Sequence, residues 1–455
     1  MNSSFFGDML QTIAERGRAL IAGRQRRPAG EARTATLVER CEELLSIRGE
    51  ASGTALAREI LLDFQEMKTG ERVAFFEALA RIFGPDRERL MRACAVYASD
   101  PSDAAAAEVL DAAEPRRQEL VRRLNLAPSA TGTLVAMREQ LLDALPLRRD
   151  LSPVDHDFAH LLSSWFNRGF LVLRRIDWSS PANVLEKIIR YEAVHEIRDW
   201  DDLRARIDSP DRRCYAFFHP AMVDEPLIFV EVALTRDIPD AIGPILAGDR
   251  TPIDPREAAT AAFYSISNTQ RGLTGVTFGS FLLKQVVEEI SRELPNLATF
   301  VTLSPVPAFM EWLAEERAKP ESAAIHPGDV PALAHLDEPD WHRNAQKTAE
   351  LRPVLNALAA YYFLAARTKR GRPVDPVARF HLGNGARLER INLMADLSEK
   401  AIAQSAGLMV NYQYVLADIE KNHEAYAEAG EVVASAAAKR SLRNEKAPRT
   451  LVAQS

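Results

Sequence analysis

Cysteine is scarce in this chain of 455 residues, which contains three: Cys41, Cys94 and Cys214. They are far apart, so they form neither a zinc-binding spacing nor the framework of a disulfide-rich secreted protein. We therefore expect a protein of a reducing compartment, in particular the cytoplasm.

An excess of positive charge is also missing, as is any long apolar run. The net charge is −7, whereas binding to a nucleic-acid backbone needs surplus Lys and Arg. No run approaches the roughly 20 apolar residues that cross a membrane. The first 30 residues include Asp8 and Glu15 instead of a secretory apolar region, and the final Val-Ala-Gln-Ser is not a peroxisomal tripeptide. We expect no nucleic-acid partner, no membrane partner and no signal peptide.

Strand-like alternation is absent from residues 1–165, which instead predict one helix after another. Leu134, Met137, Leu141, Leu142 and Leu145 fall on one helical face. We predict an all-helical N-terminal domain over residues 1–168. It shows no chemical constellation, so its expected role is self-association into a dimer or tetramer.

The pattern changes near residue 170 to a mixture of strands and helices. Strands are predicted at 170–175, 213–219, 227–234, 258–267, 298–303, 387–392 and 408–414. Helices are predicted at 183–195, at 275–294, after Asp396 and through Asn422. The fold class is therefore α+β: antiparallel hairpins, a crossover helix and a mixed sheet over residues 169–430, followed by a flexible tail at 431–455.

Residues 263–307 carry the most informative pattern, a strand, a glycine-punctuated turn, a helix and a second strand ending at Ser304. Backbone N–H groups at such a turn and the helix dipole attract an anion. The order predicts a site for a phosphorylated ligand with a serine one strand away. Two ordinary interpretations stay open: Ser304-Pro305 is also a common helix N-cap, and the glycine spacing also suits close helix packing.

The strand–turn–helix order resembles the acyl-CoA-binding fold of the GNAT acyltransferases. In that fold, a pyrophosphate lies on backbone amides at the start of the helix. The acyltransferase signature is matched loosely by residues 270–275. The resemblance implies a GNAT-like mixed sheet with flanking helices.

Four stretches, in order and at the right spacing, resemble the malonyl-CoA decarboxylase family. They read Phe-Tyr-Ser-Ile-Ser-Asn-Thr-Gln-Arg-Gly-Leu-Thr-Gly-Val from residue 263, Leu-Ser-Pro-Val-Pro from 303, Phe-His-Leu-Gly-Asn-Gly-Ala-Arg-Leu-Glu-Arg-Ile-Asn from 380 and Gly-Leu-Met-Val-Asn-Tyr-Gln-Tyr from 407. The resemblance covers residues 170–425 well and the helical region more loosely. It implies conversion of malonyl-CoA to acetyl-CoA and carbon dioxide, with no metal and no organic cofactor.

The same resemblance assigns site residues. The family's catalytic serine, histidine and active-site tyrosine fall on Ser304, His381 and Tyr414. The residues implied to bind substrate are Gln270, Arg271, Thr274, Gly275, Val276, Thr277, Phe278, Gly279, Ser280 and Asn384. Thr277 departs from the pattern, because an acidic residue is expected there in animal members.

Losing carbon dioxide from a malonyl thioester leaves an enolate whose C2 must receive a proton. Imidazole titrates near neutrality and can be protonated at working pH, so we expect His381 to be the proton donor. Ser304 would bind the carboxylate or relay a proton, and the sequence leaves both roles open. His219 is treated as structural, and the basic residues 369–372 are a solvated loop or a contact for the 3′-phosphate of CoA.

Two other functions fit the same residues. The first is a CoA-dependent acyltransferase of the GNAT fold, which would need an acceptor. The second is a non-catalytic scaffold that binds malonyl-CoA.

Overall fold

The computed structural model describes residues 31–276 and 282–443, which divide into two compact units. The first unit holds the described residues up to Ser164 together with Arg271–Val276. The second holds residues 165–270 and 282–443. The predicted helical domain of residues 1–168 did not include the separate segment 271–276.

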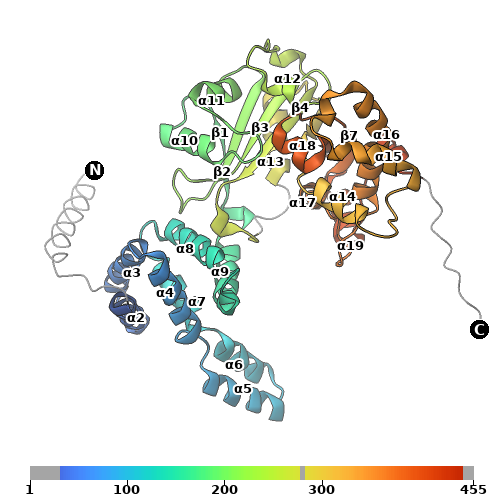
Figure 1. Ribbon diagram of the computed structural model, residues 1–455. Coiled ribbons are helices and arrows are strands. Elements are labelled where there is room, and N and C mark those ends of the chain that lie inside the picture. The colour runs from blue at the N-terminus through green and yellow to red at the C-terminus, as the bar shows by residue number, and fades with distance from the viewer. Residues whose placement is uncertain (1–30, 277–281, 444–455) are drawn as a thin grey trace, which may run out of the picture. The chain divides into compact units, whose positions relative to one another are not determined.

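The described part of the first unit is helical, as predicted (Figure 1). Side-chain caps start several helices: Asp86 accepts from the amides of Glu88 and Arg89, and Ser102 from that of Ala105. The helices are α2 (Glu31–Ser46), α3 (Glu50–Gln65), α4 (Thr69–Arg81), α5 (Arg87–Ser99), α6 (Asp103–Ala113), α7 (Arg116–Leu124), α8 (Ala130–Ala144) and α9 (Ser152–Trp165).

The predicted apolar face of α8 lies largely in the core. Leu134, Met137 and Leu141 are buried, while Leu142 and Leu145 are partly exposed. A turn of 3-10 helix, η4 (Arg271–Leu273), packs on α8 in the same unit.

The second unit contains a mixed 8-stranded sheet of order β1-β2-β3-β4-β5-β8-β6, with β7 paired to β8. The first four strands are antiparallel, β4 and β5 are parallel, and helix α13 (Leu282–Glu293) connects that pair. The predicted hairpins followed by a crossover helix are thereby confirmed. The strands are β1 (Val172–Ile176), β2 (Arg212–Phe218), β3 (Pro226–Thr235), β4 (Thr260–Asn268), β5 (Thr299–Thr302), β6 (Ser304–Pro305), β7 (Arg387–Asn392) and β8 (Met409–Gln413).

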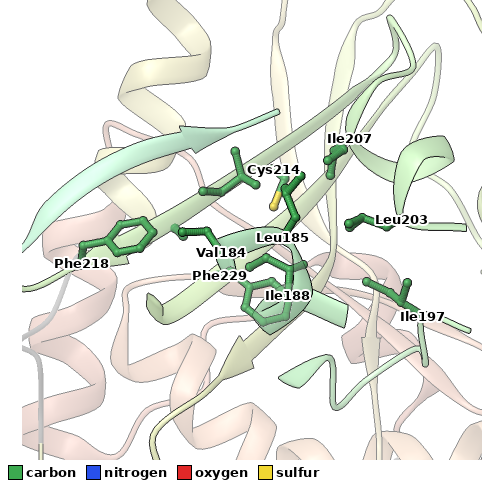
Figure 2. Close-up of a cluster of buried hydrophobic side chains, with 11 residues drawn as sticks. Val184, Leu185, Ile188, Ile197, Leu203, Ile207, Cys214, Phe218 and Phe229 are labelled. Carbon is green, nitrogen blue, oxygen red and sulfur yellow. The ribbon is translucent and has the colours of Figure 1, made fainter. Parts of the chain in front are cut away.

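Helices α10 (Ala182–Tyr191) and α11 (Trp200–Ile207) lie on the β1–β3 part of the sheet. Figure 2 shows their apolar side chains meeting strand residues such as Cys214 and Phe229. Every residue of β2 is buried, because layers cover both of its faces. This cluster packs α10 and α11 against β2 and β3, and β3 in turn pairs with β4.

The C-terminal helices surround β7 and β8 (Figure 1). They are α14 (Phe309–Arg317), α15 (Val330–Leu333), α16 (Ala345–Leu364), α17 (Pro376–Gly383), α18 (Glu399–Ser405), α19 (Ile419–Ala429) and α20 (Ala436–Ser441). The short helix α12 (Gly243–Leu246) comes earlier, between β3 and β4.

Three expectations need correction. Ser304 is not a helix N-cap, because it lies in β6 and the next helix begins at Phe309. The described part of the helix predicted at 275–294 begins at Leu282, and Phe278 lies outside the described residues. The tail is packed between 431 and 443: Ala434 bridges to Leu388 in β7, and Ala438 is 2% exposed.

Candidate active site

Strand pairing fixes the position of Ser304. It lies opposite Val410 of β8, and the neighbouring Leu303 donates its amide to the Phe263 carbonyl of β4 at 2.9 Å. Pro305 restricts the backbone immediately after the hydroxyl. Ser304 is 5% exposed, so its side chain is held within the protein instead of in solvent.

Helix α17 positions His381. Asp375 caps its N-terminus by accepting from the Ala378 amide at 2.7 Å, and Pro376 occupies the first turn. Burial raises the pKa of the Asp375 carboxyl to about 6, and the Tyr362 hydroxyl donates to it. Because α17 begins at a fixed point, its last turn carries the imidazole to the end of β6.

The two side chains meet directly. Ser304 Oγ lies 3.1 Å from His381 Nε2, and His381 Nδ1 lies 2.9 Å from the hydroxyl of Tyr414. Ser304 also donates its hydroxyl proton to Thr302 Oγ1 at 2.8 Å. The structure therefore brings together the three predicted catalytic residues.

The hydrogen bonds form a directed series. Because Ser304 gives its one proton to Thr302, its oxygen accepts from the imidazole, which puts the ring proton on Nε2. Nδ1 is then an acceptor, and the Tyr414 hydroxyl donates to it. The series runs from Tyr414 through His381 and Ser304 to Thr302 without any charged member.

Strand β8 supplies the surroundings of the imidazole. The Tyr412 ring stacks on it, with ring centres 4.6 Å apart and planes inclined by 24°. The Tyr412 amide donates to Thr302 Oγ1 at 3.1 Å, and the Asn411 side chain donates to the Thr302 carbonyl at 2.8 Å. These contacts keep both the ring plane and the Thr302 hydroxyl in fixed orientations.

Burial sets the protonation state of the pair. His381 is 2% exposed with no carboxylate bonded to it, and burial lowers its pKa to about 3. Burial also raises the pKa of Tyr414, which stays a phenol. This pKa contradicts the expectation that the imidazole can be protonated at working pH: desolvation penalises the cation, and no anion among the described residues offsets that penalty.

Ser304 and His381 open onto a cavity of about 250 Å³. Its described lining is mostly apolar and includes neither Lys nor Arg. The lining residues are Val194, Phe263, Tyr264, Ile266, Asn268, Leu303, Ser304, Pro305, Pro376, Val377, Phe380 and His381. An anionic group in this cavity would lose its water without gaining a fixed cation from the described wall.

Two predicted substrate-binding residues of the second unit, Gln270 and Asn384, do not line this cavity. Gln270 donates to the Pro226 carbonyl at 3.4 Å, and Arg271 pairs with Asp143 at 2.6 Å. Asn384 donates to the Phe380 carbonyl at the end of α17. The predicted residues Thr277, Phe278, Gly279 and Ser280 lie outside the described part of the chain.

The described part of the glycine turn is tightly folded. Thr274 and Val276 use their amides inside the turn, to the carbonyls of Arg271 and Leu273. Gly275 has φ +78°, a left-handed conformation that favours glycine, and a Cβ there would meet open space. The turn therefore needs glycine at this position for its backbone and not for packing.

Two further residues, His219 and Gly385, have structural roles. His219 accepts from the Ala221 amide, and its Nε2 bonds to the Trp165 carbonyl at 3.0 Å. Gly385 has φ +80°, and a Cβ there would lie 2.2 Å from the Ile419 carbonyl oxygen. Neither residue lines the cavity.

Sequence reasoning missed Thr302 and Tyr412. Each stands two residues before a predicted site residue, Ser304 or Tyr414. Side chains two apart on a strand point to the same face, so this alternation was the signal that could have found them.

Within residues 31–276 and 282–443, no group of three or more His, Cys, Asp or Glu side chains could hold a metal ion. The same residues contain no helix that is both long and apolar enough to span a bilayer.

Comparisons with known proteins agree over nearly the whole described chain. The family model of the malonyl-CoA decarboxylase C-terminal domain matches residues 169–452, and that of the N-terminal domain matches residues 83–166. The mitochondrial malonyl-CoA decarboxylase of Mus musculus is 36% identical over 392 residues, which are 79% of this chain and 79% of that protein.

Two solved structures are also similar. Malonyl-CoA decarboxylase from Rhodopseudomonas palustris has 56% identity and a TM-score of 0.87, covering 91% of this chain and 100% of that one. The enzyme from Agrobacterium vitis has 54% identity and a TM-score of 0.86, covering 90% and 100%.

Proposed function

This chain belongs to the malonyl-CoA decarboxylase family, and we propose that Tyr414, His381 and Ser304 form a neutral proton relay in its active site. The chain is accordingly a carboxy-lyase that converts malonyl-CoA to acetyl-CoA and carbon dioxide. The observation that carries the proposed mechanism is the 3.1 Å contact between Ser304 Oγ and His381 Nε2 at the wall of a largely apolar cavity.

The surroundings of His381 support proton donation over nucleophilic catalysis. A nucleophilic serine needs a base that holds its proton as an imidazolium, which a carboxylate usually stabilises. Here the second ring nitrogen faces the phenol of Tyr414, and burial lowers the imidazole pKa to about 3. A neutral imidazole bonded to Ser304 at Nε2 and to Tyr414 at Nδ1 can release its Nε2 proton as Nδ1 takes one from the phenol, so it passes a proton on without storing a second.

The proposed reaction begins when the malonyl carboxylate enters the cavity and loses its hydration. The bond between the carboxyl carbon and C2 breaks, carbon dioxide leaves, and the electron pair passes into the thioester as an enolate. C2 then takes the Ser304 hydroxyl proton. As the serine gives up its proton, His381 Nε2 reprotonates it and the Tyr414 hydroxyl protonates Nδ1. After the product leaves, a proton from solvent in the cavity reaches Nε2 through Ser304, and the Nδ1 proton returns to Tyr414. The starting tautomer is thereby restored, and one proton is consumed per turnover.

The glycine turn is the proposed site for the CoA phosphates. Gly275 is the described position whose amide would face an anion, since Thr274 and Val276 spend theirs within the turn. The remaining predicted positions, 277–280, lie outside the described residues. We propose that Arg271, Gln270 and Asn384 contribute to substrate binding indirectly, because their hydrogen bonds and ion pairs hold the neighbouring backbone in place.

The test is to incubate the purified protein with malonyl-CoA in deuterated water. We expect carbon dioxide and acetyl-CoA carrying one deuterium at C2, detected by mass spectrometry. Carbon dioxide release that requires an added amine acceptor would favour the acyltransferase. Tight binding without any product would favour the scaffold.

We also propose that the reaction needs neither a metal nor an organic cofactor. The thioester carbonyl itself accepts the electron pair, so the substrate supplies its own electron sink. Turnover should survive exhaustive dialysis against a chelator. Loss of activity that a divalent metal restores would contradict this proposal.

We propose a homo-oligomer, a dimer or tetramer, assembled through the helical unit. The α5–α6 hairpin supports this, because Met91 and Leu110 are each 73% exposed. Light scattering of the intact chain should give a single dimeric or tetrameric mass that falls in the variant M91E/L110E. A wild-type monomer, or an unchanged mass in the variant, would contradict it.

We further propose that the protein acts in a reducing compartment, the cytoplasm. Cys41, Cys94 and Cys214 are all free thiols, and Cys94 is exposed. Thiol labelling of protein taken directly from cells should modify Cys94. Recovery of Cys94 in a disulfide would argue against the assignment.

A further inference from the structure

The first unit holds a buried arginine that no step of the proposed reaction uses. Arg138 of α8 is 3% exposed and donates to the carbonyls of Gly272 at 2.8 Å and Thr274 at 2.9 Å. Its Nε also donates to Asp155 of α9 at 2.8 Å. One guanidinium thus joins two helices to the backbone of the glycine turn.

Gly272 shows how closely the turn lies on α8. A Cβ at this residue would be 2.0 Å from the Val135 carbonyl oxygen, a distance that real Cβ atoms do not show. Gly272 is therefore glycine because of close approach, whereas Gly275 is glycine because of its positive φ. Val135 and Arg138 are three residues apart, so one face of α8 makes both contacts.

The same face of α8 also contacts the turn through ion pairs that are exposed to solvent. The exposed Arg271 pairs with Glu139 at 3.3 Å and with Asp143 at 2.6 Å. These surface pairs contribute little free energy, but they act on the residue next to the one that Arg138 binds. Within the first unit, the turn is fixed by a buried arginine and a backbone contact, with ion pairs around them.

Fixing the carbonyls has a consequence for anion binding. Carbonyl oxygens repel phosphate, so a turn that binds phosphate through its amides must direct its carbonyls elsewhere. Arg138 takes two of them and holds the intervening residues in one conformation. A preorganised turn binds its ligand without the entropic cost of ordering a mobile one.

We propose that Arg138 is a positioning residue for acyl-CoA binding: the helical unit sets the affinity for the CoA nucleotide by clamping the 271–276 turn. The proposal rests on the assignment of this turn to the CoA phosphates. It gives the helical unit a role in substrate affinity, besides any role in self-association.

The chain provides a matched control. Arg117 of α7 is also buried, at 6% exposed, and pairs with Asp157 of α9, which also accepts from Gln118. This pair lies in the same unit but does not touch the turn. Arg117→Gln should therefore reproduce the loss of a buried ion pair without loosening the 271–276 backbone.

The experiment compares R138Q and R117Q on two substrates, malonyl-CoA and malonyl-pantetheine, which lacks the nucleotide. In R138Q we expect the KM for malonyl-CoA to rise roughly 5- to 50-fold, while kcat and the KM for malonyl-pantetheine stay within about two-fold. R117Q should lower the unfolding temperature comparably and leave both KM values unchanged.

Equal KM values for malonyl-CoA in R138Q and R117Q would overturn the proposal, as would equal rises on both substrates in R138Q. Failure of the proposed function looks different, because the wild type would then release no carbon dioxide from either substrate.

A second measurement needs no variant. In hydrogen exchange on the wild type, added CoA should protect the peptides covering 271–276 and α8 together, but not the α7 peptide. Protection of the turn without α8 would also overturn the proposal, even if R138Q failed to fold. Protection of neither would instead overturn the assignment of the turn to the CoA phosphates, on which the proposal rests.

Discussion

Buried polar groups are handled differently in the helical unit and at the candidate active site. In the helical unit they are ion pairs, Arg117 with Asp157 and Arg138 with Asp155, and each arginine has further hydrogen-bond partners. At the candidate active site they are neutral. Separating a buried ion pair leaves an uncompensated charge, so such pairs fix the relative positions of the helices that carry them. Neutral hydroxyls and an imidazole can pass a proton along without leaving an isolated charge behind.

The sheet unit itself contains the contrasting case. Arg206 of α11 donates to the fully buried Glu231 at 3.3 Å, and burial raises the pKa of Glu231 to about 7. This pair lies under α11 and does not line the cavity. The neutrality of the Ser304 region is therefore a property of that site and not of the whole unit.

Removing the imidazole should lower kcat more than any other substitution that tests this comparison. His381→Asn should lower kcat by about 10³-fold, because a matched proton donor is typically worth 10²–10⁴-fold. The KM for malonyl-CoA should change little, since the glycine turn is untouched. Steady-state kinetics measure this loss. His219→Asn is the control, because the hydrogen bonds of His219 go to backbone atoms, and this variant should keep a normal kcat.

Removing the hydroxyl should have the next largest effect. Ser304→Ala should lower kcat by about 10²-fold, because His381 would then have to reach C2 without the intervening donor. Ser405→Ala is the matched control, since Ser405 is equally buried but bonds to the backbone carbonyls of Ala401 and Leu408. Near-normal turnover in the Ser304 variant would remove the serine from the relay.

Removing the phenol should have a smaller effect. Tyr414→Phe leaves Nδ1 without its donor and should lower kcat about 10-fold, in line with the 1–3 kcal/mol cost of an unsatisfied buried group. Tyr412→Phe keeps the ring stacked on the imidazole and should cost less. A loss of kcat in Tyr414→Phe no larger than that in Tyr412→Phe would show that the hydrogen bond to Nδ1 does not contribute to the relay.

The smallest expected effect is a loss of folding stability at acidic pH. Burial lowers the pKa of His381 to about 3 and that of His195 to about 4, below the ordinary value near 6.5. Their contribution to stability is therefore fully present above pH 6.5 and is lost as pH falls toward 4 and 3. At pH 5.5 the loss is about 1.4 kcal/mol per histidine.

Urea unfolding between pH 7.5 and 5.5 measures this loss. The wild type should lose stability across the interval, and His381→Asn should lose about half as much from these two histidines. An identical decline in both proteins would show that His381 titrates normally when folded.

Much of the fold was readable from the sequence because its signals are local. Helical periodicity identified α8 and alternation identified β3, and the strand predicted at 387–392 matches the bounds of β7. Short elements were harder to read. Ser304-Pro305 reads as a helix start, yet pairing with β8 makes it a strand, and pairing with a segment about 100 residues away leaves no local pattern.

The site was predictable in its members but not in its electrostatics. Ser304, His381 and Tyr414 were found through family resemblance, and they do converge. The neutral state of His381 was not predictable, because it depends on Tyr412, Thr302 and the closure of three elements around the ring. The association of residues 271–276 with α8 was missed for the same reason, since Arg138 lies more than 130 residues away.

The protonation state of His381 is the most direct measurement. Nitrogen-15 NMR of histidine-labelled protein, assigned with His381→Asn, should show a neutral ring with its proton on Nε2 from pH 8 to pH 5. A ring that gains a second proton with a midpoint near 6.5 would contradict the neutral relay and restore a cationic donor.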